Sequence, residues 1–176
     1  QSHSVAHTQV FSAPEIADFV SPALMRRVTV PRWPEWTPNG GIGFPLGRPL
    51  YVSAPRMTDC RRYLEDPALR EACEAYVAER GGAAFFHRSA WRRELIGVVT
   101  QFRRTRPAQG RYETDEAREA AIWNELYESK RIIETRLPGK VVRHFCYPWD
   151  KGSRLGKALS LKAGYVTNFV EQVAGR

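Results

Sequence analysis

Residues 140–167 read KVVRHFCYPWDKGSRLGKALSLKAGYVT, and this stretch decides the predicted fold. The β-prone run at 140–145 predicts a strand, and the proline-containing segment 147–152 predicts a rigid loop. Ser153 is placed to cap a helix that Gly164 ends, and a second strand begins directly afterwards. The order strand, loop, helix, strand is a βαβ unit, which indicates an α/β fold with a parallel sheet.

Three helices are predicted upstream of this unit. The first begins at Asp66-Pro67, an N-cap followed by proline in the first turn, and ends at Gly81-Gly82. The second is expected from Ser89 to about Arg104, and the third from Thr114 to about Leu137. The apolar stripe of the third helix consists of Ile122, Leu126, Ile133 and Leu137.

The first sixty residues give weaker signals. Ser12-Ala13-Pro14-Glu15 resembles a capping box, which predicts a short helix to about Val20. Residues 28–58 are rich in proline and predict an irregular excursion with a turn at Asn39-Gly40. The excursion carries four aromatic residues that either pack or bind a ligand, namely Trp33, Trp36, Phe44 and Tyr51.

Composition excludes several classes of protein. With 43% hydrophobic and 26% charged residues over 176 positions, the chain is typical of a globular domain and not of a disordered one. No apolar run approaches the roughly 20 residues that cross a bilayer, so no membrane span is expected. The net charge of +8 indicates either solvated helix faces or an anionic partner such as nucleic acid or an acidic glycan.

The cysteines and the first residue bear on localisation. Cys60 and Cys73 have the option of pairing, but the odd count of three favours a reducing compartment and hence the cytoplasm. No Cys-x-x-Cys motif indicates a thiolate zinc site. The chain starts on Gln with a motif under way by residue 3, so we expect sequence to be missing upstream.

Two short motifs are candidates for chemistry. His3 and His7 are spaced i and i+4, which on a helical turn brings two imidazoles close enough to hold one cation. The alternative is two exposed histidines near a terminus. Residues 145–149, Phe-Cys-Tyr-Pro-Trp, follow the predicted strand, either as a functional loop at its carboxyl end or as a loop whose aromatic residues fill the core.

Taken in order, these elements resemble the polysaccharide deacetylases, the chitooligosaccharide-deacetylase-like carbohydrate esterases. His3-Ser4-Val5-Ala6-His7 resembles their His-Ser/Thr-x-x-His zinc motif, and residues 145–149 resemble their third motif. The run from Glu128 to Gly139 is similar to the helix before that motif, and Lys162-Ala163-Gly164-Tyr165 is similar to the segment after it.

The resemblance covers residues 1 to about 20 and about 113 to 168. It implies a distorted (β/α) barrel in one partial domain over residues 1–176, in which residues 21–112 form a large irregular and helical insertion between the second and third motifs. It also implies metal-assisted removal of N- or O-linked acetyl groups from a polysaccharide or glycan, with a divalent metal, usually zinc.

The resemblance assigns roles to individual residues. His3 and His7 would be the two His ligands of a metal bound by one Asp and two His. The backbone N–H of Trp149 would stabilise the oxyanion, with Pro148 and Tyr147 as its neighbours in the catalytic turn. Ser4 would act beside the ligands or simply cap the turn.

The sequence departs from the family pattern at three places. The Asp-Asp motif, which supplies the base and the third ligand, normally precedes the His motif and would lie upstream of residue 1. Cys146 stands where the third motif often has a base-orienting Arg, and no Leu-x-His motif for the general acid follows Tyr165. We therefore expect a segment of a deacetylase.

Two other functions remain open. One is a non-catalytic, carbohydrate-binding relative whose tryptophans stack on sugars. The other is a basic nucleic-acid-binding module, motivated by the net charge and by arginine clusters such as 103–106. The sequence determines neither the glycan nor the oligomeric state. The localisation also stays open, because the odd cysteine count favours the cytoplasm whereas the family often works on exported polymers.

Overall fold

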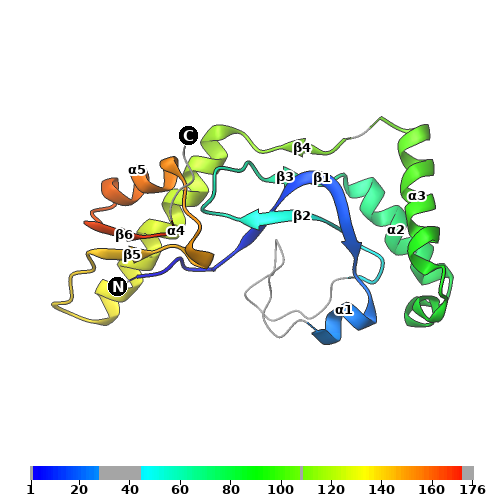
Figure 1. Ribbon diagram of the computed structural model, residues 1–176, viewed down its shortest axis with the longest axis horizontal. Helices are drawn as coiled ribbons and strands as arrows, with labels where there is room; N and C mark the ends of the chain where they lie inside the picture. Colours follow the sequence, from blue (N-terminus) through cyan, green and yellow to red (C-terminus); the bar gives the residue numbers. More distant parts are fainter. Residues whose placement is uncertain (1, 28–44, 108, 172–176) are drawn as a thin grey trace. The chain divides into compact units, whose positions relative to one another are not determined.

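The computed structural model of the chain describes residues 2–27, 45–107 and 109–171 (Figure 1). The chain divides into two compact units. Unit 1 is assembled from three stretches, Gln1–Val10, Ala54–Arg62 and Glu113–Arg176. Unit 2 is assembled from two stretches, Phe11–Ser53 and Tyr63–Tyr112.

Unit 1 contains the predicted βαβ element. Strands β5 (His144–Cys146) and β6 (Thr167–Phe169) pair in parallel, and helix α5 (Arg154–Lys162) connects them in sequence. The Oγ of Ser153 accepts the N–H of Gly156 at 2.9 Å, so the predicted helix cap is confirmed together with the parallel pairing. Strand β5 is shorter than predicted, because it covers only His144–Cys146 and the sequence predicts a strand over residues 140–145.

Helix α4 (Asp115–Arg136) is the longest element of unit 1. The Oγ1 of Thr114 accepts the N–H of Ala117 at 3.2 Å, which confirms the predicted start of this helix. Its buried face packs into one hydrophobic cluster, formed by Met57, Ile122, Leu126, Val142, Phe145, Tyr147, Leu159 and Tyr165. Burying each large apolar side chain stabilises such a core by roughly 1.5–3 kcal/mol.

Unit 2 combines helices with short strands. The unit contains most of two strands, β1 (Gln9–Phe19) and β2 (Pro49–Pro55). These strands form a two-stranded sheet. Strands β3 (Tyr63–Leu64) and β4 (Arg111–Tyr112) pair antiparallel. Its helical elements are α1 (Pro22–Arg27), α2 (Pro67–Glu79), the 3₁₀ helix η1 (Gly82–His87) and α3 (Trp91–Thr105).

The helices of unit 2 follow their sequence signals. The Oδ1 of Asp66 accepts the N–H groups of Ala68 and Leu69, as expected of an N-cap before Pro67. One core cluster of the unit is formed by Phe19, Leu69, Cys73, Val77, Phe85, Leu95 and Val99. A second is formed by Phe11, Val20, Leu50, Tyr51 and Tyr63.

Two predictions for the first sixty residues are wrong. The helix expected from Ser12 is instead β1, in which the Ser12 Oγ donates to the Val52 carbonyl of β2 at 3.2 Å. Residues 49–55 are a strand although the sequence predicts irregular structure. Local signals failed because strand pairing depends on partners far away in sequence. Tyr51 is buried, whereas the other aromatic residues of the excursion and its expected turn lie outside the described residues.

The sheets of the described residues each have two strands. The fold is thus mixed helix and sheet, and the distorted (β/α) barrel with an insertion at 21–112 stays a prediction. Among the described residues, no helix combines the length and the apolar character needed to cross a bilayer.

Candidate functional site

The first residues of the chain extend the parallel sheet of unit 1. The N–H of Ser2 donates to the His144 carbonyl at 2.7 Å, and the N–H of Cys146 donates to the Ser2 carbonyl at 2.9 Å. Because this segment runs parallel to β5, both leave the pairing at the same end. His3 therefore emerges at the edge where the turn after Cys146 begins.

This arrangement brings the predicted site residues together. The ring centroids of His3 and His7 are 4.9 Å apart, and those of His7 and Trp149 are 4.0 Å apart. The two histidines lie on an irregular turn and not on the helical turn that their spacing suggests. The Ser4 Oγ accepts the N–H of His7 at 3.1 Å, so Ser4 caps this turn.

The hydrogen bond of His3 determines which ring nitrogen is free. His3 Nδ1 lies 2.6 Å from the backbone carbonyl oxygen of Cys146. Since a carbonyl oxygen only accepts, Nδ1 must carry the proton, and in the neutral ring the lone pair is on Nε2. Histidine ligands of metals are commonly oriented by such a bond from their other nitrogen.

The surroundings of His7 favour its neutral form. Burial lowers the pKa of the imidazole from its ordinary value, and the neighbouring His3 lowers it further. A backbone hydrogen bond and Glu125 oppose this shift without cancelling it. Because only a neutral imidazole ligates a metal, the lowered pKa makes His7 available as a ligand at neutral pH.

Tyr147 and Pro148 anchor the turn that follows β5. Both are buried, and the N–H of Tyr147 donates to the Phe169 carbonyl at 3.0 Å. A Cβ added at Gly152 or Gly156 would meet the Tyr147 ring at 3.2 Å or 3.3 Å, closer than ordinary van der Waals contact. The two glycines therefore make room for the ring that fixes the turn.

Trp149 occupies a strained backbone position in this turn. Its φ of 54° lies in the left-handed region, which residues with side chains rarely adopt. The next two amides, of Asp150 and Lys151, donate to carbonyls within the turn at 3.1 Å. The Trp149 N–H donates to no other described residue, and an unpaired backbone N–H is a group that can stabilise an oxyanion.

The donor set fits part of a metal site. The tautomer of His3 and the lowered pKa of His7 both suit metal ligation. The described residues contain no group of three or more His, Cys, Asp or Glu side chains arranged to hold a metal. A catalytic zinc ion normally takes three protein ligands, so these two residues fit as two of the three.

Sequence reasoning missed two groups at this site. One is the Cys146 carbonyl, a backbone acceptor that no residue pattern identifies. The other is Glu125 on α4, whose Oε2 accepts the N–H of Ala6 between the two histidines at 3.1 Å. In the sequence, Glu125 stands between Ile122 and Leu126, two apolar positions of the predicted helix. This is the only local sign that its side chain points inward and not into solvent.

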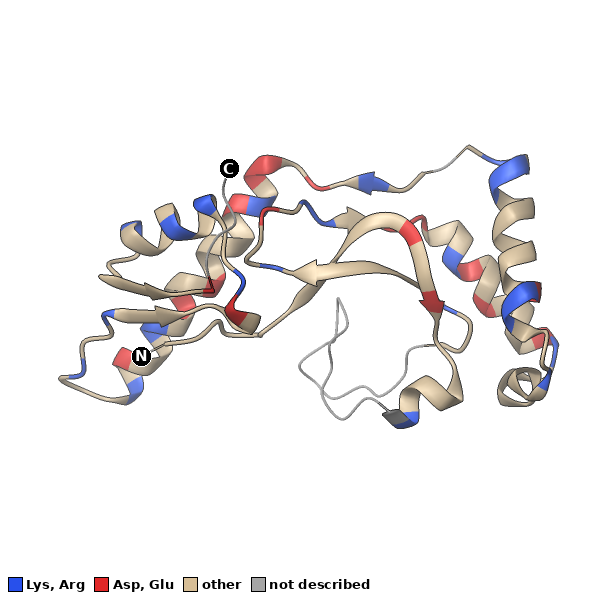
Figure 2. Cartoon of the chain, viewed as in Figure 1, with Lys and Arg blue, Asp and Glu red and all other residues tan. Residues whose placement is uncertain are grey.

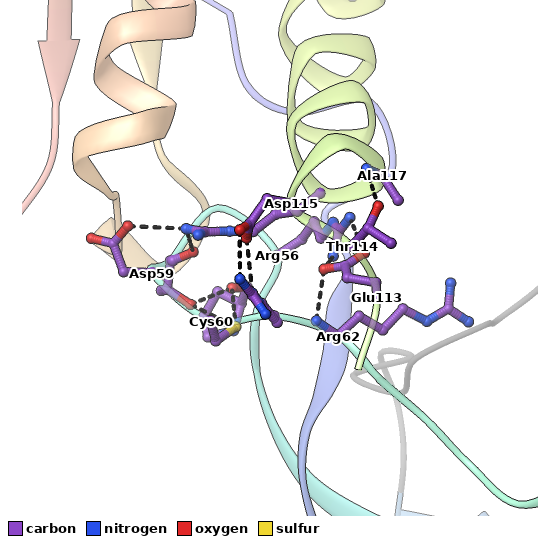
Figure 3. A network of polar contacts seen from close by, with 12 residues as sticks. Arg56, Asp59, Cys60, Arg62, Glu113, Thr114, Asp115 and Ala117 are labelled. Carbon is purple, nitrogen blue, oxygen red and sulfur yellow. Dashed lines mark hydrogen bonds and ion pairs between the residues drawn. The ribbon is translucent and has the colours of Figure 1, made fainter. Parts of the chain in front are cut away.

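A second polar cluster in unit 1 joins residues 56–62 to the start of α4 (Figure 3). Arg56 donates two hydrogen bonds to the Glu113 carboxylate, at 2.6 and 2.8 Å, and both side chains are only 7% exposed. Burial alone would raise the pKa of Glu113, but hydrogen bonds from Arg56 and from the Arg62 N–H outweigh it and lower the pKa. We call Arg56, Arg62 and Glu113 the arginine–carboxylate clamp and expect it to have a structural role.

The positive charge lies on helices of both units (Figure 2). In α3, Arg92 pairs with Asp18 at 2.6 Å and Arg103 donates to the Pro14 carbonyl at 3.1 Å. Arg93 and Arg104 of the same helix are exposed. The arginine clusters thus act partly in folding unit 2, as expected of helix faces that are solvated on one side.

Comparisons with protein-family models, with curated proteins and with solved structures found no match to this chain. The case for a functional site comes from the contacts of its own residues.

Proposed function

We propose that the protein is a metal-dependent hydrolase that removes acetyl groups from a polysaccharide or glycan. The observation that carries the proposal is the meeting of His3, His7 and Trp149. His3 and the Cys146 carbonyl that orients it are 143 positions apart in sequence. This contact between distant segments supports the proposed likeness to the polysaccharide deacetylases, whose motifs occur in the same order.

In this proposal His3 and His7 hold a divalent metal, most simply zinc, through neutral imidazoles. When bound, zinc supplies Lewis-acid chemistry and lowers the pKa of water. The Cys146 carbonyl keeps the His3 ring in one tautomer. The Trp149 N–H donates to the oxygen of the acetyl carbonyl as negative charge develops there. A third ligand and a general base are required in addition to these residues.

The test is an acetyl-release assay on the full-length protein. N-acetylated chitooligosaccharides and an O-acetylated glycan serve as substrates, before and after treatment with a chelator and again after zinc is restored. We expect activity that disappears with the chelator and returns with zinc. Activity that is insensitive to metal removal would contradict the proposal.

Variants assign the activity to the site. His3→Ala and His7→Ala are each expected to lower kcat/KM by about 100-fold or more, because metal binding itself is lost. The matched control is His87→Ala, since His87 is exposed on η1 of unit 2. Equal activity of the His7 variant and the control would remove the histidine pair from the mechanism.

A non-catalytic relative is the second candidate. The observation in its favour is that the described residues bring together two metal ligands but not three. This candidate predicts zinc binding and retention on an acetylated glycan column without acetyl release. An anionic glycan would suit the net charge of +8, and equal retention on neutral and anionic glycan columns would remove that preference.

A further inference from the structure

We propose that Glu125 and Ser129 of α4 are positioning residues for the histidine pair. This inference rests on the proposed function, because it concerns how the same two histidines are held. The segment that carries them has little regular structure of its own, with only Ser2 paired in the sheet of unit 1 before β1 begins. Its geometry must therefore come from contacts with other elements.

Glu125 fixes the middle of the segment. Its Oε2 accepts the N–H of Ala6 at 3.1 Å. Ala6 immediately precedes His7, whose φ of 49° is in the left-handed region. A hydrogen bond from a turn amide to a carboxylate is charge-assisted and therefore stronger than one to a neutral acceptor such as water. Glu125 thereby holds the backbone that aims the His7 ring.

Ser129 fixes the beginning of the segment. It is buried, and its Oγ lies 3.0 Å from the Oγ of Ser2, the residue before His3. The Ser129 Oγ also donates to the Leu126 carbonyl at 3.0 Å, and the Tyr165 hydroxyl bonds to the same carbonyl at 3.0 Å. Ser129 is therefore locked in place when it meets Ser2.

The spacing of the two groups makes α4 a rigid support. Residues i and i+4 lie on the same face of a helix, one turn apart. Glu125 and Ser129 have this relation within a helix of 22 residues. They hold the segment at Ala6 and at Ser2, so the backbone on both sides of His3 is tied to one face of α4.

A rival interpretation gives the Glu125 carboxylate a chemical role through its negative charge, as a base or a ligand. The two interpretations differ for glutamine. The amide oxygen of Gln still accepts the Ala6 N–H but carries no charge. Positioning predicts rescue by Gln, whereas chemistry through the charge predicts that Gln fails as Ala does.

The experiment measures zinc affinity by titration calorimetry on the full chain carrying Glu125→Ala, Glu125→Gln or the control Glu119→Ala. Glu119 is exposed on the same helix. We expect the Ala variant to bind zinc about 10-fold to 100-fold more weakly, as for other residues that orient ligands. The Gln variant should stay within about threefold of the unchanged protein. Ser129→Ala should weaken binding less than Glu125→Ala, because the Ser2 Oγ retains the His3 carbonyl as an acceptor at 3.2 Å.

A second readout needs neither metal nor activity. Imidazole signals of His3 and His7 are followed by nuclear magnetic resonance in ¹⁵N-labelled protein without zinc. Glu125→Ala should move both sets of signals towards those of the exposed His87, and Glu125→Gln should not. Unmoved signals and unchanged zinc affinity in Glu125→Ala would overturn the inference, as would a Gln variant as weak as the Ala variant. If the unchanged protein binds no zinc, the proposed function fails, and the resonance signals still decide the positioning role.

Discussion

The two units differ in which residues adopt left-handed backbone. In unit 2 the described residues with positive φ are all glycines, namely Gly47, Gly81 and Gly82. In unit 1, besides two glycines, three residues with side chains do so, namely His7, Trp149 and Asp150. Each such residue costs of order 1 kcal/mol relative to glycine.

This difference shows which unit contains destabilising backbone conformations. In the described part of unit 2, every residue with positive φ is a glycine. Among the described residues of unit 1, the strained positions with side chains lie at the candidate site, where His7 contacts Trp149. Strain of this kind persists when the surrounding structure enforces it, and it clusters at functional sites. The clamp and the apolar core of unit 1 are the elements that can hold such a site.

The largest expected effect is loss of the arginine–carboxylate clamp. Arg56→Met leaves the Glu113 carboxylate buried without its cation, so unit 1 should lose about 3–5 kcal/mol of unfolding free energy. Urea unfolding followed by circular dichroism measures the loss. The control is Arg61→Met, since Arg61 pairs with Asp115 at the surface, where ion pairs contribute at most about 1 kcal/mol. Equal losses in the two variants would show that the clamp does not hold unit 1.

The next effect tests the relaxed turns of unit 2. A Cβ at Gly47, where φ is +90°, would lie 2.6 Å from the Val77 Cγ2 and 2.9 Å from the Cys73 carbonyl oxygen. Gly47→Ala should therefore destabilise the protein by about 2–3 kcal/mol through overpacking and strain. Gly82→Ala, at φ +58° with nothing within 4 Å, should cost only about 1 kcal/mol. A Gly47 variant no worse than the Gly82 variant would contradict the close packing.

A smaller effect sharpens the contrast at the site itself. Asp150 is exposed and has φ 55°. Asp150→Gly should be more stable than Asp150→Ala by about 0.5–1 kcal/mol, because glycine relieves the strain and both variants remove the charge. Thermal unfolding gives the difference. A glycine variant that is the less stable of the two would mean that the turn is not strained.

The smallest effect is expected from acid. Since the folded pKa of Glu113 lies below its unfolded value, this group contributes stability above the unfolded pKa and loses it as the pH falls through the folded pKa. Burial partly cancels the hydrogen bonds, so the net contribution is modest. Unfolding free energies measured from pH 7 down to about pH 3 should decline less steeply in Glu113→Gln than in the unchanged protein. Identical slopes would assign the acid sensitivity elsewhere.

The sequence predicts those elements whose signals are local. The helix starts at Asp66, Thr114 and Ser153 are predicted correctly because each N-cap bonds residues two or three positions away. The segment beginning at Ser12 carries a similar local pattern and is nevertheless a strand. Its partner β2 begins thirty residues after β1 ends, so the pairing left no signal in the pattern around Ser12.

The candidate site was predictable only in part. The resemblance to a family associated His3 and His7 with Trp149, and the structure places their rings together. The spacing of the histidines suggested a helical turn, yet the segment is irregular and is held by Glu125 and the Cys146 carbonyl. These contacts join positions more than a hundred residues apart, and residue types alone do not specify them.

The assembly of unit 1 from three stretches has a consequence for synthesis on the ribosome. Every residue of unit 2 is made before any part of α4 or β5 exists. A nascent chain therefore contains all residues of unit 2 before Cys146 is added. The Cys146 carbonyl, which binds His3, lies 143 positions after it. At roughly 5–20 residues per second, synthesis from His3 to Cys146 takes about 7–30 seconds. The histidine pair is therefore translated before every residue of unit 2, and His3 cannot reach its bonding partner until Cys146 has been made.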